Sequence, residues 1–215
     1  MDDTLSLDLW ADVVCPFCCL GRRQLETALG RFAHAEQVRV RHHAFELDPS
    51  APRVFETPVV EMLAEKYSTS HEQITSMHAR LEAQAAEHGM SWSLASAQPG
   101  NTFDAHRLVK LAETQGRGPD VLDALYAAHF EQARCVGERA TLLAIAEDLG
   151  VQGAARTLDG ADFADEVRDD EALAARLGLR GVPALVLDNA FLVSGAQGVE
   201  AYLAALERAW DHRGD

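Results

Sequence analysis

The residues best suited to chemistry in this sequence are four cysteines, three of which fall within five positions. Cys15, Cys18 and Cys19 are clustered, whereas Cys135 stands alone. A structural disulfide framework would spread its cysteine pairs along the chain, so the cluster indicates a reactive site. Cys15 and Cys18 form a Cys-Pro-Phe-Cys pattern. Residues three apart lie on the same face of a helix, so these two sulfurs can form and break a disulfide bond.

The two sulfurs of this pair are expected to play unequal roles. Cys15 would lie at the N-terminus of a helix, where unpaired amide N–H groups and the helix dipole favour a thiolate, so we predict that it attacks. Cys18, one turn further along the buried face of the helix, is the predicted resolving sulfur. Pro16 sets the turn between them and Phe17 adds no charge, which predicts an intermediate to reducing potential. Both are candidate substrate contacts.

A zinc site is the main alternative explanation for a Cys-x-x-Cys pattern. The sequence contains no second such pattern and no His-x3-His. The adjacent His42 and His43 would point to opposite faces of a strand. We therefore predict no metal site. Cys19 is four residues from Cys15 and could compete as a resolving thiol, but we predict that it and Cys135 are packed side chains.

The sequence around the cysteine pair predicts a strand that leads into a helix. Residues 5–14 alternate between an apolar face and a second face that carries Asp8 and Trp10, which is the period of a strand. From Cys15 onward the apolar residues follow one helical stripe. Residues 38–45 are a second predicted strand, and the right-handed crossover between the two strands makes them parallel neighbours.

The C-terminal part of the sequence returns to strand character after a long helical region. Residues 184–187 and 191–193 are predicted strands, joined by a hairpin turn at Asp188-Asn189. A final amphipathic helix contains Trp210.

Between these two ends, the sequence shows only helical periodicity from about residue 57 to about residue 159. The βαβ pattern at the N-terminus and the ββα pattern at the C-terminus are interpreted as two parts of one α/β domain. We place that domain at residues 1–50 and 160–215, and an all-helical insertion at residues 51–159.

Composition and charge exclude several classes of protein. The sequence has 34 acidic and 19 basic side chains and a formal net charge of -15, which disfavours nucleic acid and anionic membrane surfaces as partners. No apolar run approaches the roughly 20 residues that cross a bilayer. The first residues also lack the basic and apolar regions of an export signal. We therefore predict a cytoplasmic protein.

Several segments resemble the DsbA-like branch of the thioredoxin superfamily. These are Trp-Ala-Asp-Val-Val-Cys-Pro-Phe-Cys at residues 10–18 and Gly-Val-Pro at residues 181–183. Residues 101–108, Asn-Thr-Phe-Asp-Ala-His-Arg-Leu, and residues 193–197, Val-Ser-Gly-Ala-Gln, are most similar to the FrnE-type cytoplasmic proteins. The resemblance spans almost the whole chain. It implies an α/β thioredoxin-like fold (βαβ…ββα) with an all-helical insertion.

The resemblance also implies the positions of further site residues. The Val182-Pro183 peptide bond should be cis and should face the cysteines, which makes Pro183 a candidate catalytic residue. The main-chain N–H and C=O of Val182 would then be free to pair with an extended substrate. Asn101 and His106 are candidate residues of the substrate groove.

Asp12 is a candidate proton relay, because it precedes Cys15 by three residues on the strand that leads into the helix. Thiol–disulfide exchange requires a proton to move to or from Cys18, and a nearby carboxylate could carry it. A carboxylate that caps the helix or is solvated explains Asp12 equally well.

These observations predict a thiol–disulfide oxidoreductase that reduces or isomerises disulfides of proteins or peptides. No cofactor is expected beyond the Cys15-Cys18 pair, glutathione could serve as a co-substrate, and the protein could be a monomer or a homodimer. Two alternatives belong to other classes. Kappa-type glutathione transferases and chromene-carboxylate isomerases share the split architecture but use a single Ser or Cys with glutathione, against which Cys18 argues. A binding protein could instead hold a soft metal ion in its cysteine cluster and have a chaperone-like surface.

Overall fold

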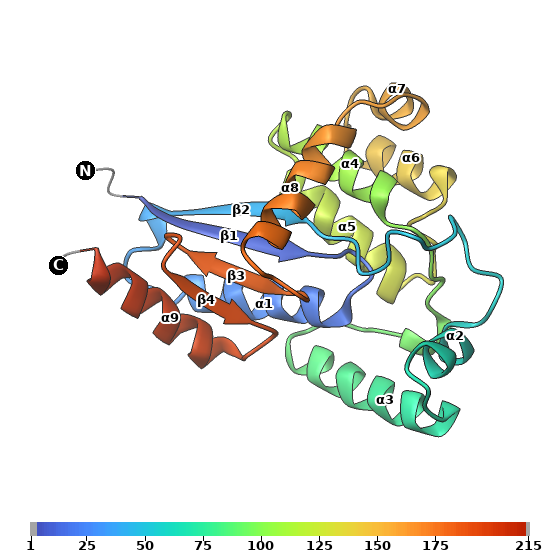
Figure 1. Ribbon diagram of the computed structural model, residues 1–215, viewed down its shortest axis with the longest axis horizontal. Coiled ribbons are helices and arrows are strands. Elements are labelled where there is room, and N and C mark those ends of the chain that lie inside the picture. Colours follow the sequence, from blue (N-terminus) through green and yellow to red (C-terminus); the bar gives the residue numbers. More distant parts are fainter. Residues whose placement is uncertain (1–3, 214–215) are drawn as a thin grey trace. The chain divides into compact units, whose positions relative to one another are not determined.

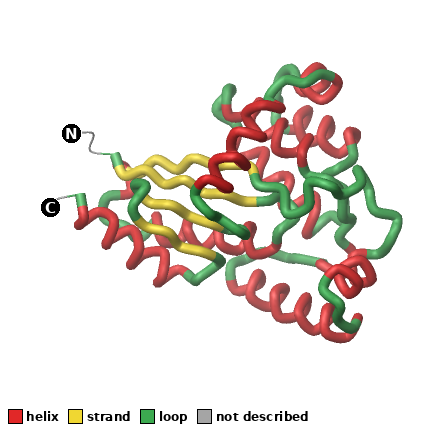
Figure 2. Tube along the Cα trace, in the orientation of Figure 1, coloured by secondary structure: helices red, strands yellow, loops and turns green. Residues whose placement is uncertain are grey.

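The computed structural model describes residues 4–213, which form two compact units (Figure 1). The sheet unit consists of the described residues up to Leu47 and from Asp169 onward, and the helical unit consists of Asp48–Arg168. All strands of the described chain belong to the sheet unit, whereas the helical unit contains helices and loops (Figure 2). The division into folding domains that we place at residues 50/51 and 159/160 stays a prediction.

The elements follow the order expected from the sequence. The sheet unit contains β1 (Leu5–Ala11), α1 (Pro16–Leu29), a 3-10 turn (Ala35–Gln37), β2 (Val38–Ala44), β3 (Ala184–Leu187), β4 (Phe191–Ser194) and α9 (Val199–His212). The helical unit contains α2 (Val59–Lys66), α3 (His71–Glu87), a 3-10 turn (Leu94–Ser96), α4 (Phe103–Glu113), α5 (Gly118–Phe130), α6 (Arg139–Asp148) and α7 (Ala154–Asp159). Helix α8 (Ala164–Arg176) begins in the helical unit and ends in the sheet unit.

The strands of the described chain form one mixed sheet in the order β2-β1-β3-β4. β1 and β2 are parallel, β1 and β3 are antiparallel, and β3 and β4 form an antiparallel hairpin. The parallel pairing confirms the prediction for the N-terminal strands. Asp188 and Asn189 both have positive φ angles, 46° and 55°, as the predicted two-residue hairpin turn requires.

The first strand is shorter than its alternating pattern predicts. β1 ends at Ala11 and not at residue 14, because the amide of Cys15 donates to the carbonyl of Asp12 at 3.1 Å and turns the chain into α1. A turn of this kind depends on main-chain geometry, which side-chain alternation does not report.

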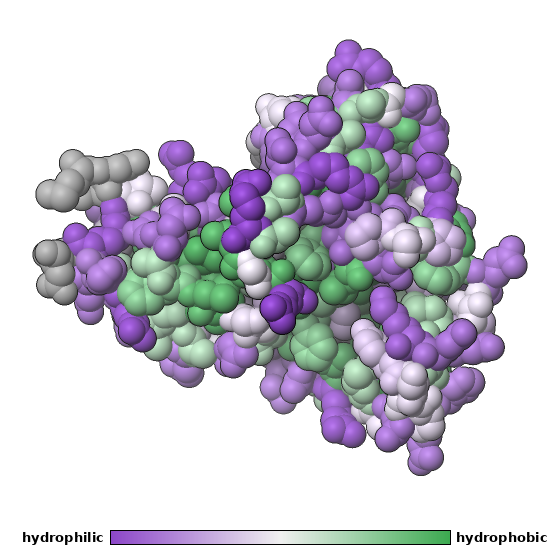
Figure 3. All heavy atoms as spheres, in the orientation of Figure 1, coloured by the Kyte–Doolittle hydropathy of each residue, from purple (hydrophilic) through white to green (hydrophobic). Residues whose placement is uncertain are grey.

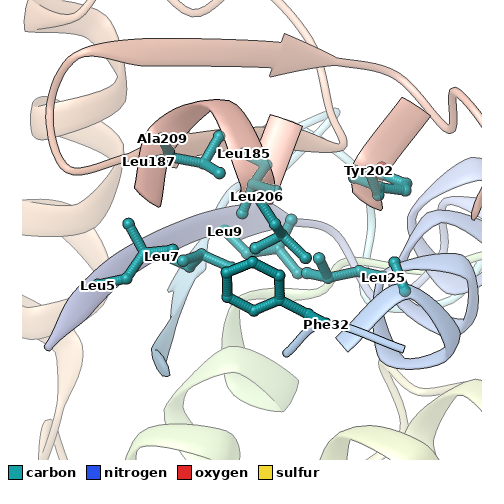
Figure 4. Close-up of a cluster of buried hydrophobic side chains, with 11 residues drawn as sticks. Leu5, Leu7, Leu9, Leu25, Phe32, Leu185, Leu187, Tyr202, Leu206 and Ala209 are labelled. Carbon is teal, nitrogen blue, oxygen red and sulfur yellow. The ribbon is translucent and has the colours of Figure 1, made fainter. Parts of the chain in front are cut away.

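One face of the sheet is covered by α1 and α9, whose apolar side chains interlock with those of β1 and β3 (Figure 4). Fully buried leucines from both strands form the centre of this cluster. They are Leu5, Leu7, Leu9, Leu185 and Leu187. Because α1 carries the cysteine pair, this packing fixes the helix relative to the strands that surround it.

The second face of the sheet is buried over the central strands β1 and β3, and its residues are more polar. Trp10 packs with Ala174, from the part of α8 that belongs to the sheet unit, and with Val186. Its indole N–H donates to the carbonyl of Asp170 at 3.0 Å. Asp8 lies on the same face and is also buried. On the side drawn in Figure 3, hydrophobic residues are visible over β3 and β4 of the sheet unit.

A network of charged side chains lies on this second face. The ring of His43 lies between two carboxylates, with Nδ1 2.6 Å from Asp170 and Nε2 2.8 Å from Asp8. Arg41 also donates to both carboxylate oxygens of Asp8, at 2.8 and 3.0 Å. Burial acts to lower the pKa of His43, but the hydrogen bonds to Asp170 and Asp8 outweigh it and raise that pKa. The network therefore favours the protonated imidazole.

Candidate active site

Cys15 is placed by the junction between β1 and α1. It is the N-cap residue of α1, with φ −92° and ψ 113°, and Pro16 follows it in the first turn. The carbonyl of Cys15 accepts from the amides of Cys18 at 3.0 Å and of Cys19 at 3.2 Å. No side chain caps α1 and its first turn holds no acidic residue. The sulfur of Cys15 is therefore attached at the positive end of the helix, as predicted.

Cys18 has the environment of a resolving thiol. It is 0 % exposed and forms a side-chain hydrogen bond with Cys15. Burial raises the pKa of Cys18 well above its ordinary value, and the hydrogen bond and charge of Cys15 raise it further. At Asp12 a main-chain hydrogen bond lowers this pKa, whereas the charge of the carboxylate raises it. Cys18 is thus held as a protonated thiol next to Cys15, and the predicted burial and high pKa are confirmed.

Val182 and Pro183, which precede β3, lie next to Cys15 although they are far from it in the sequence. The thiol of Cys15 donates to the carbonyl oxygen of Val182 at 3.8 Å, which is within the range of sulfur hydrogen bonds. The Val182-Pro183 bond is cis, as the resemblance implies. The structure therefore brings Cys15, Cys18, Val182 and Pro183 together within the sheet unit. Their roles in catalysis and substrate binding stay predictions.

Asp12 is neither solvated nor a helix cap, so the alternative explanation of this residue is wrong. It is 1 % exposed, and its Oδ2 accepts from the amide of Leu47 at 2.7 Å. Its negative charge also helps to raise the pKa of Cys18. A buried carboxylate that acts electrostatically on Cys18 is compatible with a proton relay, and that role of Asp12 stays a prediction.

Asn101 and His106 belong to the helical unit, at and near the start of α4. Oδ1 of Asn101 accepts from the amide of Phe103 at 3.0 Å, which stabilises the first turn of the helix. His106 is buried one turn further along. Their assignment to the substrate groove stays a prediction.

Arg107, in the same segment 101–108, is a structural residue for which the sequence predicts no role. Its guanidinium group is buried and joins α4 to the chain that runs from α7 to α8. It donates to the main-chain oxygens of Thr157, Gly160 and Asp162 and to the carboxylate of Asp104. The pattern of this segment therefore reflects, at least at Arg107, the packing of the helical unit.

Gly21 is a second residue whose importance only the structure reveals. A β-carbon on Gly21 would lie 3.1 Å from Cγ of Pro183 and 3.0 Å from the hydroxyl oxygen of Tyr202. Both distances are shorter than ordinary carbon contacts. A glycine at this position of α1 lets the segment of Pro183 and helix α9 approach the cysteine-bearing helix. The one available signal in the sequence was a glycine inside a helical pattern.

The other two cysteines are packed side chains, as predicted. Cys19 and Cys135 are both buried. The thiol of Cys135 donates to the carbonyls of Pro99 at 3.6 Å and Arg53 at 3.8 Å, and burial raises its pKa. Among residues 4–213, the structure brings together no group of three or more His, Cys, Asp or Glu side chains suited to a metal ion.

Comparisons with known proteins agree with this geometry. A family model described as a DSBA-like thioredoxin domain matches residues 6–207. The crystal structure of a probable DsbA oxidoreductase from Streptomyces coelicolor is 40% identical, with a TM-score of 0.93 over 96% of this chain and 90% of that chain. No curated protein matches the sequence.

Two more distant structures share the fold. A cytosolic disulfide reductase from Pseudomonas aeruginosa, DsbM, solved with GSH, is 22% identical, with a TM-score of 0.65 over 94% of this chain and 98% of that chain. A 2-hydroxychromene-2-carboxylate isomerase is 13% identical, with a TM-score of 0.74 over 98% of both chains. At these identities the similarity shows the fold alone. Within the described residues, the search for a membrane-spanning helix found none.

Proposed function

Because the chain belongs to the family of DSBA-like thioredoxin domains, we propose that it is a disulfide reductase or isomerase that acts on polypeptides through Cys15 and Cys18. The observation that carries this proposal is the buried thiol of Cys18, hydrogen-bonded to Cys15 and with a raised pKa. Cys15 at the helix N-terminus is 4% exposed and Cys18 is 0% exposed, and a pair with one sulfur at the helix N-terminus and a second one behind it is suited to attack and then resolution.

In the proposed reaction, the thiolate of Cys15 attacks one sulfur of a substrate disulfide. The substrate S–S bond breaks, a mixed disulfide with Cys15 forms, and the released substrate sulfur takes up a proton. Cys18 then loses its proton and attacks the sulfur of Cys15, which releases the second substrate thiol and leaves a Cys15-Cys18 disulfide. We propose that Asp12 accepts the proton of Cys18, because its buried charge already acts on that thiol.

The oxidised pair must be reduced before the next cycle. We propose a cytoplasmic location and glutathione as the reductant, since two glutathione molecules can reduce the pair and leave as glutathione disulfide. Two features support the reducing direction. Neither Pro16 nor Phe17 brings a charge that would stabilise a thiolate, and the structurally similar Pseudomonas aeruginosa protein is a cytosolic disulfide reductase solved with GSH.

The direct test is to equilibrate the protein with glutathione buffers and to measure the dithiol fraction of Cys15 and Cys18. We expect a mostly reduced pair at a potential of roughly −220 to −260 mV, the range of the cytosolic glutathione pool. The same protein should reduce a peptide disulfide with glutathione as electron donor. A pair that never forms a disulfide in oxidised glutathione would contradict the proposal. Glutathione binding without that disulfide would favour a transferase, and stoichiometric binding of a soft metal would favour a metal-binding protein.

Phe17 is expected to contribute to substrate affinity. It is 44% exposed next to Cys15, so a docked peptide would cover part of its ring. Losing that burial costs about 1 kcal/mol, which corresponds to about a fivefold change in affinity. We therefore expect Phe17→Ser to raise KM for a peptide disulfide about fivefold while kcat changes little.

The matched control for Phe17 is Leu192→Ser on the edge strand β4. Leu192 is 56% exposed, so its replacement removes a comparable exposed apolar side chain from the same unit. KM should be unchanged in this variant. If Phe17→Ser also keeps the wild-type KM, Phe17 does not contact the substrate.

A further inference from the structure

Tyr202 is a buried residue of α9 that the reaction described above does not use. It is 1 % exposed and belongs to the apolar cluster between α9, α1 and the sheet (Figure 4). Its hydroxyl group donates to the carbonyl of Gly195 at 3.0 Å. A phenylalanine would fill the same apolar space, so the hydroxyl group of Tyr202 serves this polar contact and not the packing.

Gly195 connects Tyr202 to the site. It follows β4 with a φ angle of 81°, and its amide donates to the carbonyl of Pro183 at 2.8 Å. The preceding carbonyl, that of Val182, accepts from the thiol of Cys15 at 3.8 Å. An uninterrupted series of hydrogen bonds and peptide units therefore runs from α9 to the reactive sulfur.

The hydroxyl group of Tyr202 is also held on the side of α1. It lies 3.0 Å from the point that a β-carbon on Gly21 would occupy, and Pro183 lies 3.1 Å from the same point. Burial, together with the charge of Cys18, raises the pKa of Tyr202 to about 12. The hydroxyl group therefore keeps its proton, and with it the bond to Gly195, throughout the neutral pH range.

We propose that Tyr202 is a positioning residue of the dithiol site, whose hydroxyl group holds the turn at Gly195 and, through Pro183, keeps the carbonyl of Val182 against Cys15. The contacts of Tyr202 alone support the positioning role. The effect on catalysis rests on the proposed function, because the main chain at Val182 is where a polypeptide substrate would dock.

Tyr202→Phe removes only the hydroxyl group. A typical buried hydrogen bond contributes roughly 1 kcal/mol, so the variant should fold. Without the donor, the turn should open more often, and the amide of Gly195 should exchange with solvent about fivefold faster, as 1 kcal/mol implies. Amides within β1 and β3 should keep their wild-type exchange rates.

The loss of the Tyr202 hydroxyl group should also change the reactivity of Cys15. The thiol of Cys15 is buried and lies against the carbonyl of Val182, so a displaced carbonyl exposes the sulfur to reagents. We expect Cys15 of Tyr202→Phe to be alkylated by iodoacetamide at pH 7 about two- to threefold faster than wild type, as followed by mass spectrometry of the Cys15 peptide. In contrast, kcat/KM for a peptide disulfide should fall about five- to tenfold through KM, because the docking main chain is misplaced.

Two controls separate positioning from loss of stability. Tyr126→Phe removes another buried tyrosine hydroxyl, in α5 of the helical unit, and should leave Gly195 exchange, Cys15 alkylation and KM unchanged. Incorporation of 4-aminophenylalanine at position 202 restores an N–H donor and should bring all three quantities back toward wild type.

The inference is overturned if Tyr202→Phe unfolds at a lower temperature but shows wild-type Gly195 exchange and Cys15 alkylation. Failure of the proposed function has a different signature. In that case the wild-type protein would not reduce the peptide disulfide, while the exchange and alkylation rates would still decide the role of Tyr202.

Discussion

Replacing Cys18 with alanine is expected to trap the protein on its substrates and to lower multiple-turnover disulfide reduction by roughly 100-fold or more. Cys18 is fully buried and hydrogen-bonded to Cys15, so it is the thiol placed to attack the sulfur of a mixed disulfide. Without it, attack by Cys15 still occurs but resolution does not. Cells that express Cys18→Ala should therefore contain covalent protein adducts, which non-reducing electrophoresis detects and dithiothreitol removes.

The controls for this experiment are the other cysteines. Cys15→Ala should give almost no adducts, because the attacking sulfur is gone. Cys135→Ala removes a thiol that is also buried with a raised pKa, and it should turn over like wild type. Cys19 could resolve adducts in place of Cys18, so Cys18→Ala combined with Cys19→Ala must be included. Absence of protein adducts in that double variant would refute the proposed oxidoreductase.

The ionic network on the second face of the sheet predicts the largest effect on stability. In His43→Gln, the carboxylates of Asp8 and Asp170 lose the cation that lies between them at 2.8 and 2.6 Å. Removing one partner of a buried charged group costs roughly 3 kcal/mol. We therefore expect the free energy of unfolding of His43→Gln to be lower by about that amount at pH 6, as measured by urea titration.

The same network makes the stability of the protein depend on pH in a predictable direction. The pKa of His43 is raised in the folded state, so the folded protein binds the proton more tightly than the unfolded chain. This contribution to stability is fully present below the unfolded pKa of about 6.5 and is lost as the pH rises through the raised pKa. The free energy of unfolding of the wild type should thus fall over this interval.

The pH dependence can be assigned to His43 with a matched variant. Like His43, His34 stacks on a tryptophan. The ring centroids of His34 and Trp210 are 4.1 Å apart, and those of His43 and Trp10 are 4.3 Å apart. His34→Gln should keep the slope of stability against pH, and His43→Gln should lose it. A slope that survives in His43→Gln would show that other groups cause it.

The strand-to-helix junction that carries the cysteines and the order of elements could be predicted because their signals are local. The spacing of Cys15 and Cys18, the strand before them and the helix after them all lie within about 25 residues, and helical and strand periods are properties of such short windows. The hairpin at Asp188-Asn189 is similar, since two adjacent residues determine the turn. The end of β1 was wrong by three residues, because the turn at Asp12 depends on a main-chain hydrogen bond.

Other properties of the site could not be predicted, because they arise between residues far apart in the sequence. Alternation predicts a second face of the first strand that carries Asp8 and Trp10, and only the packing of residues from Asp169 onward buries these two side chains. The sequence leaves Asp12 open between a proton relay and a solvated or capping carboxylate. Its burial excludes a solvated carboxylate, and the start of α1 has no side-chain cap.

The sequence by itself therefore determined the strand-to-helix junction that carries Cys15 and Cys18 and the succession of strands and helices, since each depends on neighbours along the chain. Only the tertiary structure decided which distant groups lie near that junction. Gly21, Pro183, Gly195 and Tyr202 come from α1, the residue before β3, the turn after β4 and α9, and they meet because those elements pack on one sheet. Close contacts of this kind leave no period or motif in the sequence, because they depend on how distant segments fill the same volume.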